Sequence, residues 1–151
     1  KKKKKVEKNF EKNLKEVEWA NDEKDMFEHW DVKGLFKGEV LKFDVKGKKK
    51  VNRADANSQD EIAWIEGTNV WGKPGWIKGK ADYIVFERND YWLVVDRKEL
   101  YNHVVEKVKE NGVQQGRGIY KVYQRAGRQD KITMVPFDNI EKLINIHKVQ
   151  K

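Results

Sequence analysis

The stretch that decides the fold is EHWDVKGLFKGEVLKFDVKG, residues 28–47, where Asp-Val-Lys-Gly occurs at Asp31 and again at Asp44. Apolar and polar residues alternate in it, and many of the apolar ones are β-branched or aromatic. This pattern predicts two β-strands, over residues 28–34 and 39–47. The segment between them is short enough for a hairpin, so we expect the two strands to be antiparallel neighbours.

Two acids and a lysine belong to this predicted hairpin. Strand side chains alternate between two faces, which places Asp44 and Lys46 on one face and directs Val45 into the core. With Asp31 on the same face, two carboxylates converge, and their repulsion favours a bound cation such as a divalent metal ion. The alternative interpretation is a half-exposed strand with solvated charges, which shows the same alternation.

Composition limits the classes of protein that the motif can belong to. The chain has 151 residues, enough for one domain with a core, and six Trp, six Phe and five Tyr argue against disorder. A formal net charge of +8 favours a polyanionic partner such as nucleic acid. Without cysteine, disulfides and thiolate zinc sites are excluded, which favours an intracellular protein. No apolar run approaches the roughly 20 residues that cross a bilayer, so we expect no membrane association.

The expected organisation is a flexible basic arm over residues 1–8 and a single domain over residues 9–151. Helices are predicted over residues 9–19 (from Phe10, Leu14 and Val17 at helical spacing), 98–110 and 139–148, the last capped by Asp138. Further strands are predicted over residues 61–69, 80–87, 91–96, 118–125 and 131–137, the first five strands forming a meander. The order αβββββαββα predicts an α+β domain with a central mixed or antiparallel β-sheet flanked by helices.

The spacing of Asp31, Asp44 and Lys46, an acid followed after twelve residues by Asp-x-Lys on a strand, resembles the PD-(D/E)XK nuclease superfamily. The segments WDVKG, FDVKG, WIEGTN and GWIKGKADYIVFE are similar to small phage-type endonucleases, and the resemblance spans residues 10–140. It implies a restriction-endonuclease-like αβββαβ core, Mg²⁺ as cofactor with Mn²⁺ as a substitute, DNA as substrate, and a possible homodimer.

The resemblance also implies roles for individual residues. The two aspartates would hold the metal ion together with the Val45 carbonyl. Lys46 would orient or deprotonate the attacking water and stabilise negative charge in the transition state. Many members carry a further acid on a helix, for which Glu18 is the candidate here, and Glu66 in WIEG is a second candidate ligand.

A second set of residues satisfies the same loose pattern. Asp82 is followed after thirteen residues by Asp96, Arg97 and Lys98, which makes Asp82, Asp96 and Lys98 an alternative catalytic set. DRKE is also typical of a capping box, in which Asp96 accepts from the first helical amides and Glu99 reaches back. That interpretation explains Asp96 without catalysis, and Asp82 is then expected to be a paired, partly buried carboxylate.

Basic residues near aromatic ones suggest where a phosphate backbone would bind. The predicted nucleic-acid-binding residues are Lys48, Lys49, Arg53, Arg117, Lys121, Arg125 and Arg128. Charges that protect an edge strand from aggregation would look similar. His29, His103 and His147 show no zinc spacing and are expected to be incidental. Two functions remain: a Mg²⁺-dependent DNA endonuclease, or a catalytically inactive basic module of the same fold that binds nucleic acid or protein.

Overall fold

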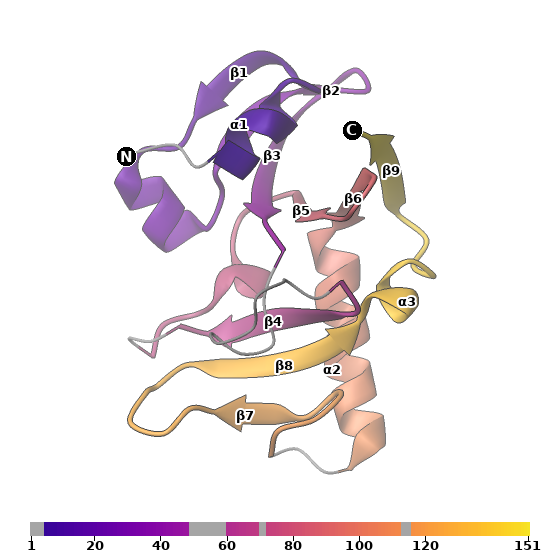
Figure 1. Ribbon diagram of the computed structural model, residues 1–151. Coiled ribbons are helices and arrows are strands. Elements are labelled where there is room, and N and C mark those ends of the chain that lie inside the picture. Colours follow the sequence, from indigo (N-terminus) through magenta and orange to yellow (C-terminus); the bar gives the residue numbers. More distant parts are fainter. Residues whose placement is uncertain (1–4, 49–59, 70–71, 113–115) are drawn as a thin grey trace.

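The computed structural model describes residues 5–48, 60–69, 72–112 and 116–151 (Figure 1). Its strands are β1 (Lys15–Trp19), β2 (Val32–Phe36), β3 (Glu39–Lys46), β4 (Ile62–Thr68), β5 (Tyr83–Glu87), β6 (Tyr91–Asp96), β7 (Val122–Gln124), β8 (Lys131–Pro136) and β9 (Ile146–Gln150). Its helices are α1 (Lys5–Glu11), α2 (Arg97–Asn111) and α3 (Phe137–Ile140), with a π-helical turn η1 (Lys24–Glu28) and a 3-10 turn η2 (Trp76–Lys78).

The strands form two sheets. Six strands lie in the order β1-β2-β3-β5-β6-β9, and three in the order β4-β8-β7. β3 and β5 are parallel, whereas the other neighbours in the large sheet are antiparallel, so this sheet is mixed. The predicted α+β class with a mixed sheet is therefore confirmed.

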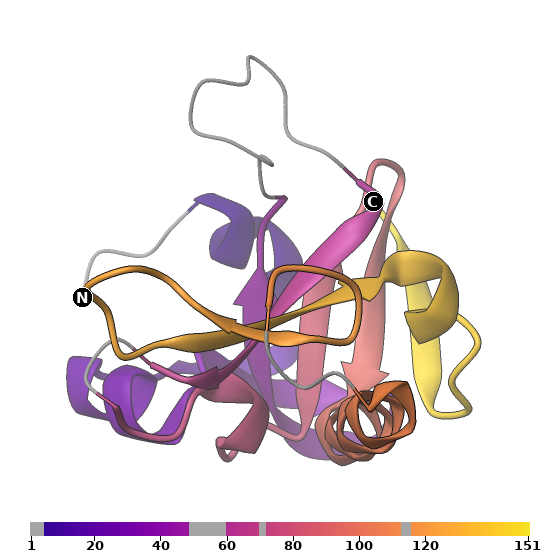
Figure 2. The ribbon, with the colours of Figure 1, turned by 90° about the horizontal axis from the view of Figure 1, so that it is seen from below.

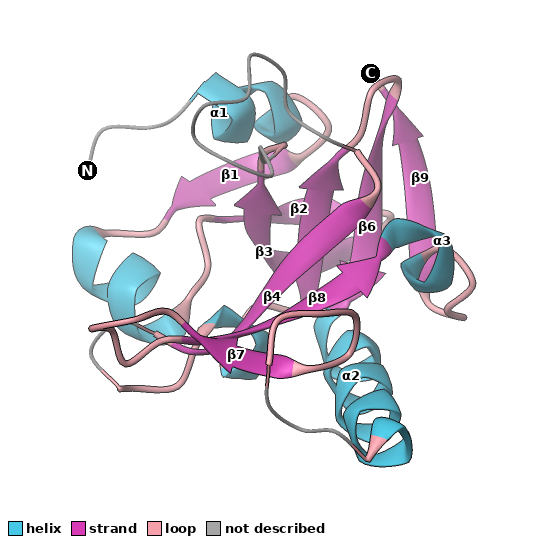
Figure 3. Ribbon diagram, turned by 60° about the horizontal axis from the view of Figure 1, so that its bottom comes forward, coloured by secondary structure: helices cyan, strands magenta, loops and turns pink. Residues whose placement is uncertain are grey.

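The two faces of the large sheet are covered by different elements. Helix α1 lies over one face, and the three-stranded sheet and α2 lie over the other (Figure 3). Figure 2, seen along α2, shows this helix beside the strands of the large sheet. Strand residues alternate between the two cores, because Ile84 and Phe86 of β5 pack toward the small sheet while Val85 packs toward α1.

Strand β3 joins the same alternation at its C-terminal end. Val45 is 6% exposed and packs in the core under α1, as predicted. The register pairs Asp44 with Ile84 and Lys46 with Phe86, so these two polar side chains point toward the small sheet. The face of the hairpin that carries Asp44 and Lys46 is thus the face that β4 partly covers.

The N-terminal predictions were wrong in two respects. Residues 9–19 do not form one helix: α1 ends at Glu11, and β1 pairs antiparallel with β2. Pairing with β2 prevails over a helical spacing of only three apolar residues. The flexible arm does not extend to residue 8, because α1 begins at Lys5 and buries Phe10 completely. Residues 1–4 lie outside the described residues.

Two further predictions fail beyond β3. The C-terminal helix over residues 139–148 is not formed: α3 ends at Ile140, its N-cap is Pro136 rather than Asp138, and β9 pairs with β6. The five strands that were predicted to form a meander do not form one, because β4 belongs to the small sheet and pairs with β8. The connection from β3 to β5 therefore passes through the small sheet.

Helix α2 confirms its prediction most closely. Asp96 caps it by accepting from the Glu99 backbone N–H at 2.9 Å, and Gly112 ends it in the left-handed conformation. Glu99 does not reach back to the cap, since its carboxylate accepts from the N–H groups of Ile144 and Asn145. In the described part of the chain, no helix has the length and apolar character that a membrane crossing requires.

Candidate active site

The β2–β3 hairpin brings the two predicted acids together. Val32 pairs with Phe43 across the hairpin, and the Asp31 N–H donates to the Phe43 carbonyl oxygen at 2.8 Å. The side chains of Asp31 and Asp44 are hydrogen-bonded to each other. The two side chains are each 4% exposed. Asp31 Oδ2 also accepts from the Val45 backbone N–H at 2.7 Å, which fixes the carboxylate against the neighbouring strand. Hydrogen bonds of the hairpin thus bring the two carboxylates together, and the packing around them buries both.

Asp44 is influenced by both neighbouring charges, Lys46 and Asp31. Burial raises the pKa of the Asp44 carboxyl well above its usual range, the Lys46 ammonium lowers it, and the Asp31 carboxylate together with an Asp31–Asp44 hydrogen bond raises it further. The Lys46 Nζ lies 3.2 Å from Asp44 Oδ2. Asp44 is thus buried beside both a lysine and a second carboxylate. A proton or a bound cation would reduce the repulsion between the two acids.

A cavity of about 270 Å³ opens beside these carboxylates. We call it the acidic pocket, and it is lined by Val6, Glu7, Asp25, His29, Asp31, Asp44, Val45, Lys46, Gly47 and Lys48. Glu7 is only 3% exposed, although it comes from a helix in the expected basic arm. Glu7 is thus a buried acid on a helix at this cavity, the kind of position that the sequence analysis expected for Glu18. Glu7 precedes Phe10 by three residues, which places both on one helical face, and that spacing was the signal for it.

Glu18 itself belongs elsewhere. It lies on strand β1 rather than on a helix, its side chain is 53% exposed, and it pairs with Lys33 at 3.6 Å. Its assignment as the helical acid was wrong, because β1 is a strand at the edge of the sheet. His29, expected to be incidental, lines the acidic pocket, and its Nε2 donates to the Pro74 carbonyl oxygen at 3.0 Å.

Glu66 faces the hairpin from β4 of the small sheet. Burial raises the pKa of its carboxyl, and the nearby Lys46 ammonium and His29 lower it. The Trp76 backbone N–H donates to it. Gly75 makes this approach possible, since a Cβ there would lie 2.3 Å from the Glu66 carbonyl oxygen. Glu66 therefore lies near Lys46, but it is not among the residues that line the acidic pocket, so its role as a metal ligand stays a prediction.

The oxygen donors of the site fit a metal ion in part. Within residues 5–48, 60–69, 72–112 and 116–151, no group of three or more His, Asp or Glu side chains stands ready to hold one. What the site does contain is a buried pair of hard oxygen donors, Asp31 and Asp44, a ligand type that suits Mg²⁺ or Mn²⁺ with most of its coordination shell as water. Asp31 and Asp44 fit that role, and Val45 as a carbonyl ligand remains a prediction.

The alternative set has a different environment. Asp82 is exposed, contrary to expectation, and its Oδ2 accepts from the Lys42 backbone N–H at 2.8 Å. Asp96 caps α2, and Lys98 is exposed on the first turn of that helix. Each of the two acids thus has a local structural role, and neither lines the acidic pocket.

The predicted nucleic-acid-binding residues divide into three groups. Lys48 lines the acidic pocket and donates to Asn89. Lys49 and Arg53 lie outside the described residues. Arg117 and Arg125 line a groove of about 840 Å³ beside β7, Lys121 and Arg128 lie close to it in sequence, and Arg125 pairs with the fully buried Asp130. Figure 1 places β7 at the outer edge of the small sheet, away from β3.

Comparison of the chain with known proteins gave no match among protein-family models, curated proteins or solved structures. The functional interpretation therefore rests on the geometry of the residues described above. Its centre is the buried pair Asp31–Asp44 with Lys46 beside it.

Proposed function

We propose that the protein is a Mg²⁺-dependent DNA endonuclease that hydrolyses phosphodiester bonds through a PD-(D/E)XK-type site. One observation carries the proposal: Asp31 and Asp44 are opposed and buried at the wall of a cavity, with the Lys46 ammonium 3.2 Å from Asp44. An opposed pair of buried carboxylates is costly without a cation. A restriction-endonuclease-like core, with α1 followed by the three strands β1 to β3, belongs to the same proposal.

Each side chain has a role that its position allows. Asp31 and Asp44 hold the metal ion, which when bound polarises the phosphate and lowers the pKa of a coordinated water. Glu7 reaches the same cavity from α1 and orients water molecules in it. The Lys46 ammonium neutralises charge that develops on the phosphate and is placed to orient the attacking water.

The surroundings of the site favour a polyanionic substrate. Lys24 and Lys42 lie over the Trp30 ring, at 5.5 and 5.3 Å from its centroid, and Lys80 adds to the positive charge around Glu28. The chain has a formal charge of +8. DNA is the proposed partner, an intracellular location follows from that substrate, and cutting both strands would need the two sites of a homodimer.

The test is cleavage of supercoiled plasmid, branched DNA and RNA, with Mg²⁺, with Mn²⁺ or with chelator. We expect metal-dependent cutting of DNA that falls about 10²–10³-fold in Lys46→Ala, while Lys98→Ala, the matched lysine of the alternative set, cuts like the wild type. Loss of cutting in Lys98→Ala with retention in Lys46→Ala would show that the wrong set was chosen.

One observation favours the second function, a catalytically inactive nucleic-acid-binding module. Lys46 and the Asp31–Asp44 hydrogen bond already satisfy part of the acidic pair without a metal ion. A module of this kind binds DNA with a steep salt dependence through the arginines beside β7 and cuts no substrate under any metal condition.

A further inference from the structure

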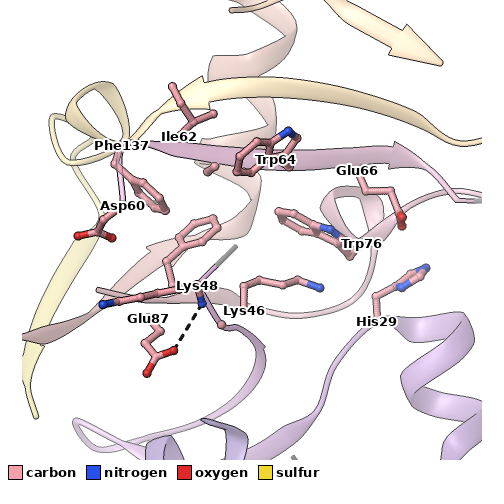
Figure 4. Close-up of a pocket in the computed structure, with 13 residues that line it drawn as sticks. His29, Lys46, Lys48, Asp60, Ile62, Trp64, Glu66, Trp76, Glu87 and Phe137 are labelled. Carbon is pink, nitrogen blue, oxygen red and sulfur yellow. Dashed lines mark hydrogen bonds between the residues drawn. The ribbon is translucent and has the colours of Figure 1, made fainter. Parts of the chain in front are cut away.

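A second cavity, of about 300 Å³, adjoins the acidic pocket (Figure 4). We call it the aromatic pocket, because Trp64, Trp76, Phe86 and Phe137 line it together with polar residues. It lies between the end of β3, one face of β4 and strand β5. Four aromatic rings around a cavity of this size are typical of a site for a small, flat and largely apolar group.

Trp64 is the side chain that core packing does not explain. Ala63 and Ile65 are core residues of β4, 3% and 1% exposed, and Ala63 also lines the cavity. Ile62, Trp64 and Glu66 alternate with them along the strand, and all three line the cavity. Among the described residues, the two core clusters account for other tryptophans but do not include Trp64. A half-buried indole with no core to fill presents its ring to whatever enters the cavity.

The two cavities share one wall. His29, Lys46, Gly47 and Lys48 line both of them. The Lys46 Nζ lies 3.2 Å from Asp44 on one side and 4.6 Å from the centroid of the Trp76 ring on the other. Figure 4 shows the Lys46 side chain extending across the cavity toward Trp76. If a phosphate group binds at Lys46, the base of the same nucleotide can therefore reach the aromatic pocket.

We propose that the aromatic pocket receives an unstacked nucleobase of the nucleotide that adjoins the scissile phosphate. The proposal deepens the proposed function and rests on it. A nucleobase is flat, stacks on aromatic rings, and is tied covalently to the phosphate that Lys46 would contact. Glu66 and His29, at one end of the cavity, are polar groups available to the edge of the base (Figure 4).

The proposal carries a consequence for substrate choice. Taking a base out of a duplex costs a few kcal/mol, and the cost is smallest where the base is mismatched or already unpaired. DNA with a mismatch, a branch or a single-stranded segment at the cut position is therefore the preferred substrate. This preference comes from the aromatic pocket and not from the metal-binding acids.

The first experiment measures the cutting rates of Trp64 variants on intact DNA and on DNA that lacks one base beside the cut. We expect Trp64→Leu to cut intact DNA about tenfold more slowly, the effect of losing one stacking partner, and to match the wild type on DNA that lacks the base on one side of the cut. Trp64→Phe retains a ring and should keep most of the cutting rate. Trp19→Leu, a half-buried tryptophan of β1, is the matched control and should behave like the wild type on both DNAs.

The bases on the two sides of the cut are removed in turn. If Trp64→Leu lowers the cutting rate equally on intact DNA and on each abasic DNA, the proposed nucleobase site is overturned while the proposed endonuclease activity stands. A binding measurement separates the two failures further. The Asp44→Asn protein should bind a duplex with a central mismatch about tenfold more tightly than the matched duplex, and the additional Trp64→Leu change should remove that difference. Equal binding of both duplexes would overturn the proposal that the aromatic pocket binds a nucleobase. Mismatch-selective binding by a wild-type protein that cuts no DNA would overturn only the proposed endonuclease activity.

Discussion

The two Asp-x-Lys sets of this chain satisfy nearly the same sequence pattern and have opposite environments. Asp31 and Asp44 are each 4% exposed and face one another across a hairpin beside Lys46. Asp82 is exposed, and Asp96 is used as a helix cap. A spacing of charges along the chain therefore says little until register and burial are known, because only a buried, opposed pair creates a need for a cation.

The largest expected effect is the difference in DNA-cutting rate between Asp44→Asn and Asp96→Asn. The first substitution removes a charged metal ligand, and DNA cutting should fall on the order of 10³-fold or more. The second keeps a good N-cap residue, so both α2 and the cutting rate should be preserved. Plasmid nicking at saturating Mg²⁺ measures both. If Asp96→Asn were the variant that lost activity, the alternative set would be the catalytic one.

The two candidate helical acids give the next comparison. Glu7→Gln should slow cutting about 10–100-fold, the size of effect seen when a group supporting the metal site is lost. Glu18→Gln removes only an exposed partner of Lys33 and should stay within about twofold of the wild type. Rates at several Mg²⁺ concentrations would show whether Glu7 acts on metal affinity, and equal rates for the two variants would contradict its role.

In the absence of metal, replacing Asp44 should stabilise the folded protein, although the same change should abolish DNA cutting. The folded-state pKa of Asp44 is raised, so the protonated acid favours folding at low pH, and that contribution is lost as pH rises through the folded pKa. At neutral pH, Asn in place of Asp44 should therefore raise the melting temperature in chelator, with the gain vanishing below about pH 4, the unfolded pKa. Thermal unfolding between pH 3 and pH 8 tests this.

Mg²⁺ provides the control for that measurement. It should raise the melting temperature of the wild type, because the ion binds the folded state, and leave that of Asp44→Asn unchanged. The Asp82→Asn protein should respond to Mg²⁺ like the wild type. A wild type whose melting temperature ignores Mg²⁺ would argue for the inactive module.

The smallest expected effect concerns the structural role of the second set. Asp96→Ala should cost about 1 kcal/mol of folding free energy, since the Glu99 N–H loses its acceptor. In a chain of this length that corresponds to a fall in melting temperature of about 2–4 °C. Asp96→Asn should cost nearly nothing. Urea unfolding at neutral pH measures both variants, and an unchanged stability in Asp96→Ala would mean that the cap contributes little.

The parts of the fold that sequence predicted correctly depend on neighbours in the chain. The β2–β3 hairpin follows from alternation and a short turn. Helix α2 follows from Asp96 and Gly112 at its ends. In each case the partner groups lie within a few residues, or across one tight turn, so local pattern is sufficient.

The failures involve partners far along the chain. The segment Ile146–Gln150 is a strand because it pairs with β6, and β4 leaves the large sheet because it pairs with β8. Glu7 enters the acidic pocket because Phe10, on the same face of α1, is buried on the large sheet. Local propensity is worth tenths of a kcal/mol per residue, so burial and sheet pairing of this kind override it.

The amino-acid sequence by itself determined the acidic hairpin, the positive charge and the α+β class, because strand alternation, turn length and composition are local properties. Only the tertiary structure decided that Asp44 is buried against Asp31, that Glu7 rather than Glu18 joins them, and that Trp64 faces a cavity next to Lys46. Those outcomes required the packing of α1 and of the small sheet on opposite faces of the large one, and burial by distant segments is not written in any single stretch of the chain.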